Sequence, residues 1–394
     1  MEPLIPNAPA APRLAVYVHF PWCLQRCPYC DFATEAVQPE RIPHARYAAA
    51  VVREFAMRRA ALAAPLRPTS LFFGGGTPSL WDPAGLGAVL GAVRACGPLD
   101  EVTVECNPTS LDAARCDAWR AAGVDRLSIG VQSLRDSHLR YLGRLHDAGG
   151  AARAVATAVG HGGFRVSADL MFGLADQTLD EALGDLGALV DAGVEHVSCY
   201  ALTIESGTRF GELSRKGKLR TLEDVRVAEM YLAIEAACEA RGLAHYEVSN
   251  YARPGAASVH NEAYWRGDAY LGLGAGAVGC VPADALGHDA VRWRNDADAA
   301  RYCDARERGE LPPGTVEPLD AATRVREALM LGLRTERGVH LREVERRTGL
   351  DARAGRERAI AHAYGRGNLE DHGDRLTIPR SRWLHADDIV ARLF

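Results

Sequence analysis

The sequence predicts an α/β fold: a partial (β/α)6, TIM-like barrel followed by a small α+β, winged-helix-like C-terminal domain. Two observations predict this. Apolar or β-branched runs alternate with stretches of helical period from residue 14 to residue 204, and the end of the chain combines two helical stretches with one short apolar run. Parallel strands joined by right-handed helical crossovers curl into a full or partial barrel.

Six strands are expected in the barrel, and they are listed here in chain order: Leu14–Phe20, Ser70–Phe73, Glu101–Cys106, Arg126–Val131, Arg165–Phe172 and His196–Ile204. A helix is expected over Thr221–Arg241, and one further strand over Tyr246–Tyr251. Because the chemistry of such barrels lies at the C-terminal ends of the strands, motifs that directly follow these runs are candidates for a site.

Four parts are expected along the chain: a flexible N-terminus at 1–12, the barrel at 13–245, an extension at 246–310 and the C-terminal domain at 319–394. The segment Leu311-Pro-Pro-Gly-Thr315 has the composition of a linker. Beyond it, helical spacing over Ala321–Leu333 and Leu341–Arg347 and a short strand at Arg375–Ile378 predict the winged-helix-like domain.

Composition excludes some classes of partner. The net charge is −5 with 25% charged residues, so no overall attraction to nucleic acid or anionic membrane is expected. The C-terminal domain intersperses 15 arginines with 12 acidic residues, as on a solvated face. No signal peptide and no apolar run of about 18 residues are recognisable, so we expect a cytoplasmic protein without a transmembrane segment.

Three cysteines, Cys23, Cys27 and Cys30, directly follow the first strand with the spacing Cys-x3-Cys-x2-Cys. They supply one ligand too few for a closed metal site, but three thiolates can hold three irons of a [4Fe–4S] cluster and leave the fourth open to a small molecule. Two alternatives stay open at this point: a dithiol redox motif at Cys27 and Cys30, and a zinc site completed by His19 or Asp31.

Glycines and polar residues follow the next strands. Gly74-Gly-Gly-Thr77 lets the backbone approach a ligand closely, and one strand after the cysteines it suits the amino group of a sulfonium cofactor. Glu105, Gln132 and Asp169 then stand at successive strand ends, where carboxylates and amides suit ribose hydroxyls and an amino-acid moiety. Each of these polar residues, taken singly, is also compatible with helix capping or a buried hydrogen bond.

These motifs together resemble the radical S-adenosylmethionine proteins of the oxygen-independent coproporphyrinogen oxidase family, and most closely its haem chaperone branch. The likeness rests on Tyr17-Val-His-Phe-Pro-Trp-Cys-x3-Cys-Pro-Tyr-Cys-Asp-Phe, Gly74-Gly-Gly-Thr-Pro-Ser, Arg126-Leu-Ser-Ile-Gly-Val-Gln-Ser-Leu, Leu142-Gly-Arg-Leu-His, Asp169-Leu-Met-Phe-Gly-Leu, Tyr246-Glu-Val-Ser-Asn-Tyr and His260-Asn-Glu-Ala-Tyr-Trp. The resemblance implies a radical S-adenosylmethionine barrel in which Cys23, Cys27 and Cys30 ligate the cluster. It further implies a cofactor site lined by Tyr17, Tyr29, Gly75, Gly76, Thr77, Glu105, Gln132, Arg144 and Asp169, with Arg144 available as a donor to the cofactor's carboxylate.

Within the family, the resemblance favours a chaperone over a decarboxylating enzyme. The decarboxylating members carry a fourth cysteine two residues after the third, where this chain has Phe32, and they have a longer segment before the first cysteine. The motif His260-Asn-Glu-Ala-Tyr264-Trp265 is associated with haem in the chaperone branch; the imidazole is a possible iron ligand and the two aromatic rings could pack on the macrocycle.

The resulting expectation is a protein that binds haem as cargo and transfers it to respiratory haem proteins, carrying a [4Fe–4S] cluster and S-adenosylmethionine. A homodimer is compatible with this function. Two alternatives are an oxygen-independent coproporphyrinogen III oxidase, which would use the radical for oxidative decarboxylation in porphyrin biosynthesis, and a glutaredoxin-like dithiol protein.

Overall fold

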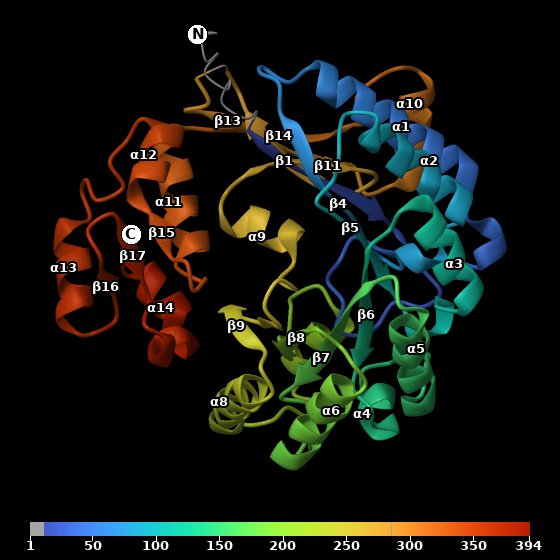
Figure 1. Ribbon diagram of the computed structural model, residues 1–394, viewed down its shortest axis with the longest axis horizontal. Helices are drawn as coiled ribbons and strands as arrows, with labels where there is room; N and C mark the ends of the chain where they lie inside the picture. Colours follow the sequence, from blue (N-terminus) through green and yellow to red (C-terminus); the bar gives the residue numbers. More distant parts are fainter. Residues whose placement is uncertain (1–11, 285) are drawn as a thin grey trace, which may run out of the picture.

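One large sheet organises the computed structural model, which describes residues 12–284 and 286–394 (Figure 1). Within these residues twelve strands form the sheet; in spatial order they are β14 (Gly314–Leu319), β13 (Ala290–Asn295), β12 (Val278–Pro282), β11 (Ala269–Leu273), β1 (Arg13–Phe20), β4 (Arg67–Gly75), β5 (Glu101–Cys106), β6 (Arg126–Gln132), β7 (Arg165–Phe172), β8 (His196–Ala201), β10 (Asn250–Ala252) and β9 (Ala244–Glu247). The run from β11 through β1 and β4 to β8 is parallel, and the strands beyond it at both edges are antiparallel. The six predicted barrel strands are confirmed; residues 1–11 of the expected flexible N-terminus lie outside the described part.

Helices cover the outside of the curved sheet, which stays open because its edge strands β14 and β9 do not pair with each other (Figure 1). The helices of this part are α1 (His44–Ala60), α2 (Pro83–Arg94), α3 (Ala113–Ala122), α4 (Asp136–Tyr141), α5 (Ala148–His161), α6 (Leu179–Asp191), α7 (Arg209–Arg215), α8 (Asp224–Ala240), α9 (Val259–Trp265) and α10 (Ala299–Glu307). The molecule is therefore a partial α/β barrel, as the sequence predicts.

Local sequence explains where the crossover helices begin. Asp112 and Asp147 cap α3 and α5 by accepting backbone N–H bonds, and Thr178 forms a capping box with Glu181 at the start of α6. Between the helices, parallel strands such as β1 are buried on both faces, so the sequence of β1 is a nearly continuous apolar run.

The segment from residue 246 to 310 is built into the same sheet. Its strand β11 pairs with β1, and the buried carboxylate of Glu54 on α1 ties the two regions together. Glu54 accepts hydrogen bonds from the Gly274 amide at 2.9 Å, the Asn295 side chain at 2.9 Å and the Tyr302 hydroxyl at 2.8 Å. A buried carboxylate with its lone pairs satisfied in this way fixes the position of the strands around it.

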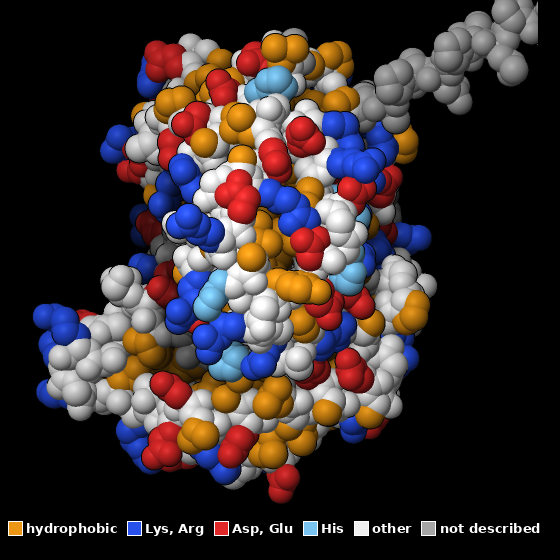
Figure 2. Space-filling model, turned by 90° about the vertical axis from the view of Figure 1, so that its left-hand side faces the viewer, with side chains coloured by type: hydrophobic (Ala, Val, Ile, Leu, Met, Phe, Trp, Pro, Cys, Tyr) orange, Lys and Arg blue, Asp and Glu red, His pale blue; other side chains and the backbone are white. Residues whose placement is uncertain are grey.

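The C-terminal domain has its own hydrophobic cluster, which includes Leu329, Val344, Leu376 and Ile389. Its elements are α11 (Ala321–Gly332), β15 (Val339–His340), α12 (Leu341–Thr348), α13 (Glu357–Gly365), β16 (Glu370–Asp371), β17 (Arg375–Thr377) and α14 (Ala386–Ala391), and the three strands form a small antiparallel sheet. Figure 2 shows that basic and acidic side chains are interspersed on the face over this domain. None of the helices in the described ranges is both long and apolar enough to cross a bilayer.

Two local predictions were wrong. The single strand expected over Tyr246–Tyr251 is a pair of antiparallel strands, β9 and β10, because Val248 and Ser249 form a turn and asparagine and serine favour turns. The expected linker ends early, since Gly314 already begins edge strand β14 against β13. An edge strand tolerates Pro318, which would be excluded from the middle of a sheet.

Candidate functional site

The three cysteines lie on the loop after β1, and a small parallel pair of strands, β2 (Trp22–Cys23) and β3 (Glu35–Ala36), frames that loop. The Cys30 amide donates to the Cys27 carbonyl at 3.1 Å, and this turn places the last two cysteines close to each other. All three thiols are partly exposed and none forms a disulfide. The loop therefore presents three available sulfurs at the C-terminal end of the first barrel strand.

Polar donors from two other segments, the turn after β4 and the loop after α4, reach these sulfurs. The Thr77 hydroxyl donates to the Cys23 sulfur at 3.4 Å, and the Arg144 guanidinium donates to the Cys27 sulfur at 3.7 Å. Burial raises the pKa of the Cys23 and Cys30 thiols. Among the residues that the structure describes, no three His, Cys, Asp or Glu side chains converge on a single metal ion, as a zinc site would require.

The glycine turn after β4 is packed so closely that side chains are excluded. A Cβ on Gly75 would lie 2.5 Å from the His19 ring, and one on Gly76 would lie 2.6 Å from the Trp22 carbonyl oxygen. The three amides of this turn are already used: Gly75 donates to Glu105 at 3.1 Å, Gly76 to Phe20 at 2.7 Å and Thr77 to Trp22 at 2.9 Å. An ammonium group would be met by the acceptors of this turn, which are its carbonyl oxygens and the Thr77 hydroxyl oxygen.

Gln132 and Arg144 lie beside the cysteine loop. Gln132 ends β6 at a register shift and holds a left-handed backbone with φ of 68°, which is uncommon for a residue other than glycine. The Arg144 guanidinium donates to the Gly130 carbonyl at 2.8 Å, while its buried Nε has no hydrogen-bond partner among the described residues. An unpaired guanidinium N–H beside the sulfurs is compatible with the expected role of Arg144 as a donor to a ligand carboxylate.

Two carboxylates face each other inside the barrel. Burial, together with the nearby charge of Asp169, raises the pKa of Glu105 to about 8. Burial also raises the pKa of Asp169, although hydrogen bonds from Ser198 and Ser128 oppose the increase. At neutral pH the pair therefore retains a proton and can both donate and accept hydrogen bonds.

A cavity of about 530 Å³ opens at this end of the barrel. The predicted site residues that line this barrel cavity are Tyr17, Gly75, Glu105, Asp169, His260 and Tyr264. The remaining ones, Tyr29, Gly76, Thr77, Gln132, Arg144 and Trp265, lie outside its wall, and the first five of these cluster around or next to the cysteine loop instead.

Sequence reasoning missed part of the wall. Arg126 and Ser128 on β6, Ser198 on β8 and Arg294 on β13 all line the cavity. Alternation along β6 and β8 was a usable signal for the first three, because their side chains share the face that carries Asp169 on β7. Nothing in the sequence pointed to Arg294, because its strand β13 is connected to the barrel strands only through β12 and β11.

The helix α9 carries the motif His260-Asn-Glu-Ala-Tyr-Trp265, and a buried anion anchors its first turn. Glu101 accepts hydrogen bonds from the amides of Val259 at 3.0 Å and His260 at 3.1 Å. The His260 ring stacks on Phe72 with centroids 4.9 Å apart, and its Nδ1 shares a 2.9 Å hydrogen bond with the Ser70 hydroxyl. Burial lowers the pKa of His260 to about 4, so the ring is neutral at physiological pH.

Comparisons with known proteins agree along most of the chain. Residues 17–189 match the radical SAM superfamily and residues 319–384 match the HemN C-terminal domain. The haem chaperone HemW of Mycobacterium tuberculosis is 36% identical over 96% of this chain and 94% of its own length, and HemW of Escherichia coli K12 is 41% identical over 68% and 71%. The chain belongs to the radical SAM, coproporphyrinogen oxidase-like family that includes HemW.

A solved relative agrees with the fold of this radical SAM chain. The structure of E. coli coproporphyrinogen III oxidase, HemN, described as a radical SAM enzyme, superposes with a TM-score of 0.77 over 97% of this chain and 90% of its own. At 19% identity this likeness concerns the fold. The predicted family and fold class are thereby confirmed.

Membership of the radical SAM family implies a [4Fe–4S] cluster and S-adenosylmethionine, and the residues present fit both. Three thiols that form no disulfide lie on the same loop. A hydroxyl and a guanidinium donate to two of them, as hydrogen-bond donors around the sulfurs of iron–sulfur sites do. Ligands to three different irons need not converge on one point, which distinguishes this arrangement from zinc. The adjoining cavity offers carbonyl, carboxyl and hydroxyl groups to a polar cofactor.

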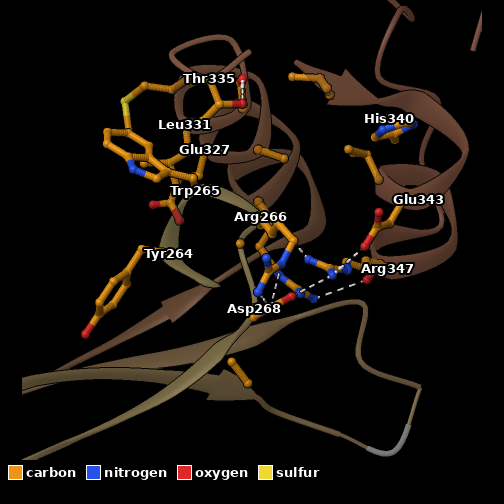
Figure 3. Close-up of a pocket in the computed structure, with 18 of the residues that line it drawn as sticks. Tyr264, Trp265, Arg266, Asp268, Glu327, Leu331, Thr335, His340, Glu343 and Arg347 are labelled. Atoms are coloured by element: carbon orange, nitrogen blue, oxygen red, sulfur yellow. Dashed lines mark hydrogen bonds and ion pairs between the residues drawn. The ribbon is translucent and has the colours of Figure 1, made fainter. Parts of the chain in front are cut away.

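The motif on α9 is divided between two cavities. His260 and Tyr264 line the barrel cavity, whereas Trp265 and the other edge of Tyr264 line a second cavity of about 460 Å³ between α9, strands β11 to β13 and the C-terminal domain (Figure 3). Trp265 follows His260 by five positions, which turns it about 140° around a helix. The three residues expected to contact haem therefore do not form one surface.

Ion pairs close the second cavity on the side of the C-terminal domain (Figure 3). Asp268, after α9, pairs with Arg266 at 3.1 Å and with Arg347 of α12 at 2.8 Å, and Arg347 also pairs with Glu343 at 2.5 Å. A second pair joins Arg292 of β13 to Glu327 of α11 at 2.6 Å. These pairs hold the C-terminal domain against the extension of the barrel.

Proposed function

We propose that this protein is a haem chaperone that holds a [4Fe–4S] cluster and S-adenosylmethionine in its barrel and transfers haem to haem proteins of the respiratory chain. One observation carries the proposal: the likeness to a protein named haem chaperone extends over 96% of this chain and 94% of that relative. Both the barrel and the C-terminal domain are included, so the match covers a whole architecture and not the cofactor barrel alone.

The cysteine loop supports this reading over oxidative decarboxylation. Phe32 occupies the position of the fourth cysteine expected in the decarboxylating branch, and 57% of its surface is exposed at the edge of the barrel cavity. No thiol is therefore available at that point of the loop. The dithiol alternative is less well supported, because the Thr77 hydroxyl donates to Cys23, a sulfur that a Cys27–Cys30 dithiol would not use.

In the proposed assignment, Cys23, Cys27 and Cys30 hold the cluster. The barrel cavity holds S-adenosylmethionine: the carbonyls of the glycine turn accept from its amino group, Arg144 donates to its carboxylate, and Glu105 and Asp169 bond its hydroxyls. When bound, the cluster supplies the electron by which this family forms a radical from the cofactor. Tyr17, Tyr29 and Gln132 complete the surroundings of the two groups.

The cellular setting is also part of the proposal. A cytoplasmic protein with haem as cargo, recipients among respiratory haem proteins, no nucleic-acid partner and a homodimeric form would agree with the composition and with the relatives. The element we associate with the cargo is α9, because its motif is the one tied to haem in this family.

The test is a haem titration of anaerobically reconstituted, full-length protein, followed by its Soret absorbance with an iron count on the same sample. We expect saturable binding of haem and no conversion of coproporphyrinogen to protoporphyrinogen when the same preparation is incubated with S-adenosylmethionine and a reductant. Absence of a Soret change would overturn the haem chaperone. Formation of protoporphyrinogen, seen by chromatography, would establish the oxidase instead.

A further inference from the structure

The position of His260 limits what it can do for a large ligand. The residue is 1% exposed, its Nδ1 is bonded to Ser70, and its Nε2 has no hydrogen-bond partner among the described residues. His260 is among the residues that line the barrel cavity. A haem iron could reach it only from inside the cavity that also adjoins the cluster.

The volume of the barrel cavity argues against such sharing. Ligand pockets in proteins generally measure roughly 300 Å³ or more, so two ligands the size of S-adenosylmethionine and haem need more than the 530 Å³ present. The groups at its centre, Glu105 and Asp169, are also polar carboxyls in contact with the cavity. An apolar macrocycle placed there would strip these groups of hydrogen-bond partners at a cost.

The second cavity has the chemistry that a haem requires. Its volume is about 460 Å³, and its walls include Trp265, Tyr270, Val281, Leu331 and Val344. Aromatic and branched aliphatic side chains of this kind pack well against the faces of a flat macrocycle. In Figure 3, Trp265 lies on one side of this cavity and His340 on the other.

Basic and metal-binding groups stand at its edge. His340 is exposed where β15 meets α12, and Arg337 is exposed on the turn just before it. Arg324, also in the wall, donates to the carbonyl oxygens of Gly287 and His288 and not to a carboxylate. An imidazole can ligate iron, and two guanidiniums can bind two propionates.

We propose that haem binds in this second cavity, with Trp265 against the macrocycle, His340 as a ligand to iron, and Arg324 and Arg337 near the propionates. The proposal rests on the haem-binding function proposed above and adds where the cargo is held. It gives the C-terminal domain a direct role in binding, and it leaves the barrel cavity to S-adenosylmethionine. Tyr264, which borders both cavities, separates the two ligands.

The experiment is a set of haem titrations on the full-length, anaerobically reconstituted protein and its variants, read by the Soret band. Trp265→Ala should weaken haem binding by about tenfold or more, since a large aromatic contact is lost. Leu331→Trp should weaken it similarly by filling the cavity. His340→Ala should shift the Soret maximum, whereas the matched control His362→Ala, an exposed histidine on α13 outside the cavity, should leave both affinity and spectrum unchanged.

A second measurement needs no variant. Haem bound to the wild-type protein should persist, with its Soret band intact, when S-adenosylmethionine is added to saturation. Displacement of haem by S-adenosylmethionine, or wild-type affinity in both Trp265→Ala and Leu331→Trp, would overturn the second cavity as the haem site while the chaperone function stands. Failure of the wild-type protein to bind haem would instead remove the proposed function. Unchanged midpoints of urea unfolding would show that the variants are folded.

Discussion

The two cavities on either side of α9 are built from different parts of the chain. The barrel cavity is formed mostly by residues of parallel strands β1 and β4 to β8, whose order the whole sheet determines, and Arg294 of β13 adds to its wall. The second cavity is formed by strands β11 to β13 and by α11 and α12. Ion pairs of Asp268 and Glu327, together with backbone hydrogen bonds such as that from the Glu336 amide to the Tyr246 carbonyl, join these helices to the rest of the chain. One is part of the core, and the other lies where two hydrophobic clusters meet.

Because of this difference, one chain can keep a cofactor and release a cargo. A site made of strand ends can change shape only if the core of the barrel changes. A site closed by ion pairs between parts with separate hydrophobic clusters can open without disturbing either cluster. A resident cluster suits the first arrangement and a transported ligand suits the second.

Removing a cluster ligand should have the largest effect, and it should distinguish the barrel cavity from the second cavity most clearly. Cys27→Ala leaves two thiolates on the loop, so we expect loss of the brown iron–sulfur absorbance and of S-adenosylmethionine binding together. Haem titration of the same variant should stay close to wild type if the second cavity is independent of the cluster. The matched control is Cys96→Ala, a half-buried thiol after α2, outside the residues that line either cavity. Retention of the absorbance in Cys27→Ala would contradict the ligand assignment.

The sequence predicted the barrel cavity well because its signals are local. The parallel strands are marked by apolar and β-branched residues, and Glu105 and Asp169 lie in the C-terminal halves of β5 and β7, so their position at the cavity follows from the order of elements. The cysteine spacing adds a chemical signal that needs no tertiary information. The nature of the glycine turn was only half predicted: a close approach of its backbone to a ligand was expected, but its close packing against His19 and Trp22 and the use of all three amides within the protein were not.

The second cavity could not be predicted in the same way. The second cavity depends on ion pairs between residues far apart in sequence, such as Asp268 with Arg347 and Arg292 with Glu327. No local sequence pattern indicates these ion pairs. The division of the haem motif was accessible in principle. Positions 260 and 264 share one face of a helix and position 265 does not, so helical geometry alone separates His260 from Trp265.

The next largest effect should come from the anchor of α9. Glu101 is fully buried, lies 3.3 Å from Arg165 and accepts from the Val259 and His260 amides. Glu101→Ala removes the anion beside the buried Arg126 and leaves helix N–H groups unpaired, and we expect the free energy of unfolding to fall by about 3–5 kcal/mol. Because α9 forms a wall of both cavities, haem and S-adenosylmethionine binding should weaken together.

Urea unfolding with both titrations measures this effect. The matched control is Glu239→Ala, since Glu239 is an exposed carboxylate that pairs with Arg380 at 3.1 Å and should contribute at most about 1 kcal/mol. Equal losses of stability in the two variants would show that the buried anion does not anchor the helix.

A smaller effect, dependent on pH, should be confined to the barrel cavity. The pKa of Glu105 is raised to about 8 in the folded protein, so the folded state keeps a proton that the unfolded chain releases above its ordinary value of 4.5. This contribution to stability is fully present below pH 4.5 and is lost as the pH rises through about 8. Glu105→Gln cannot ionise, and its stability relative to wild type should increase by about 3.5 kcal/mol between pH 5 and pH 8.

Unfolding free energies of the wild type and Glu105→Gln at several pH values check this prediction. Glu229→Gln, on the exposed side of α8, is a suitable control and should follow the wild type throughout. The same slope with pH in Glu105→Gln and the wild type would show that Glu105 ionises normally and that the cavity is well solvated.

The smallest effect concerns the backbone at Gln132, which tests how rigidly the sheet builds the barrel cavity. Its φ of 68° lies in the left-handed region, where glycine is unstrained and alanine is not. If the register shift of β6 imposes this conformation, Gln132→Gly should be more stable than Gln132→Ala by about 1 kcal/mol. Urea unfolding of the two variants measures the difference, and the reverse order would mean that the strand end relaxes once the side chain is removed. Because the sheet that sets this backbone also places Glu105 and Asp169, a preserved preference for glycine would indicate a cavity shaped before any ligand binds, in contrast to the cavity closed by ion pairs.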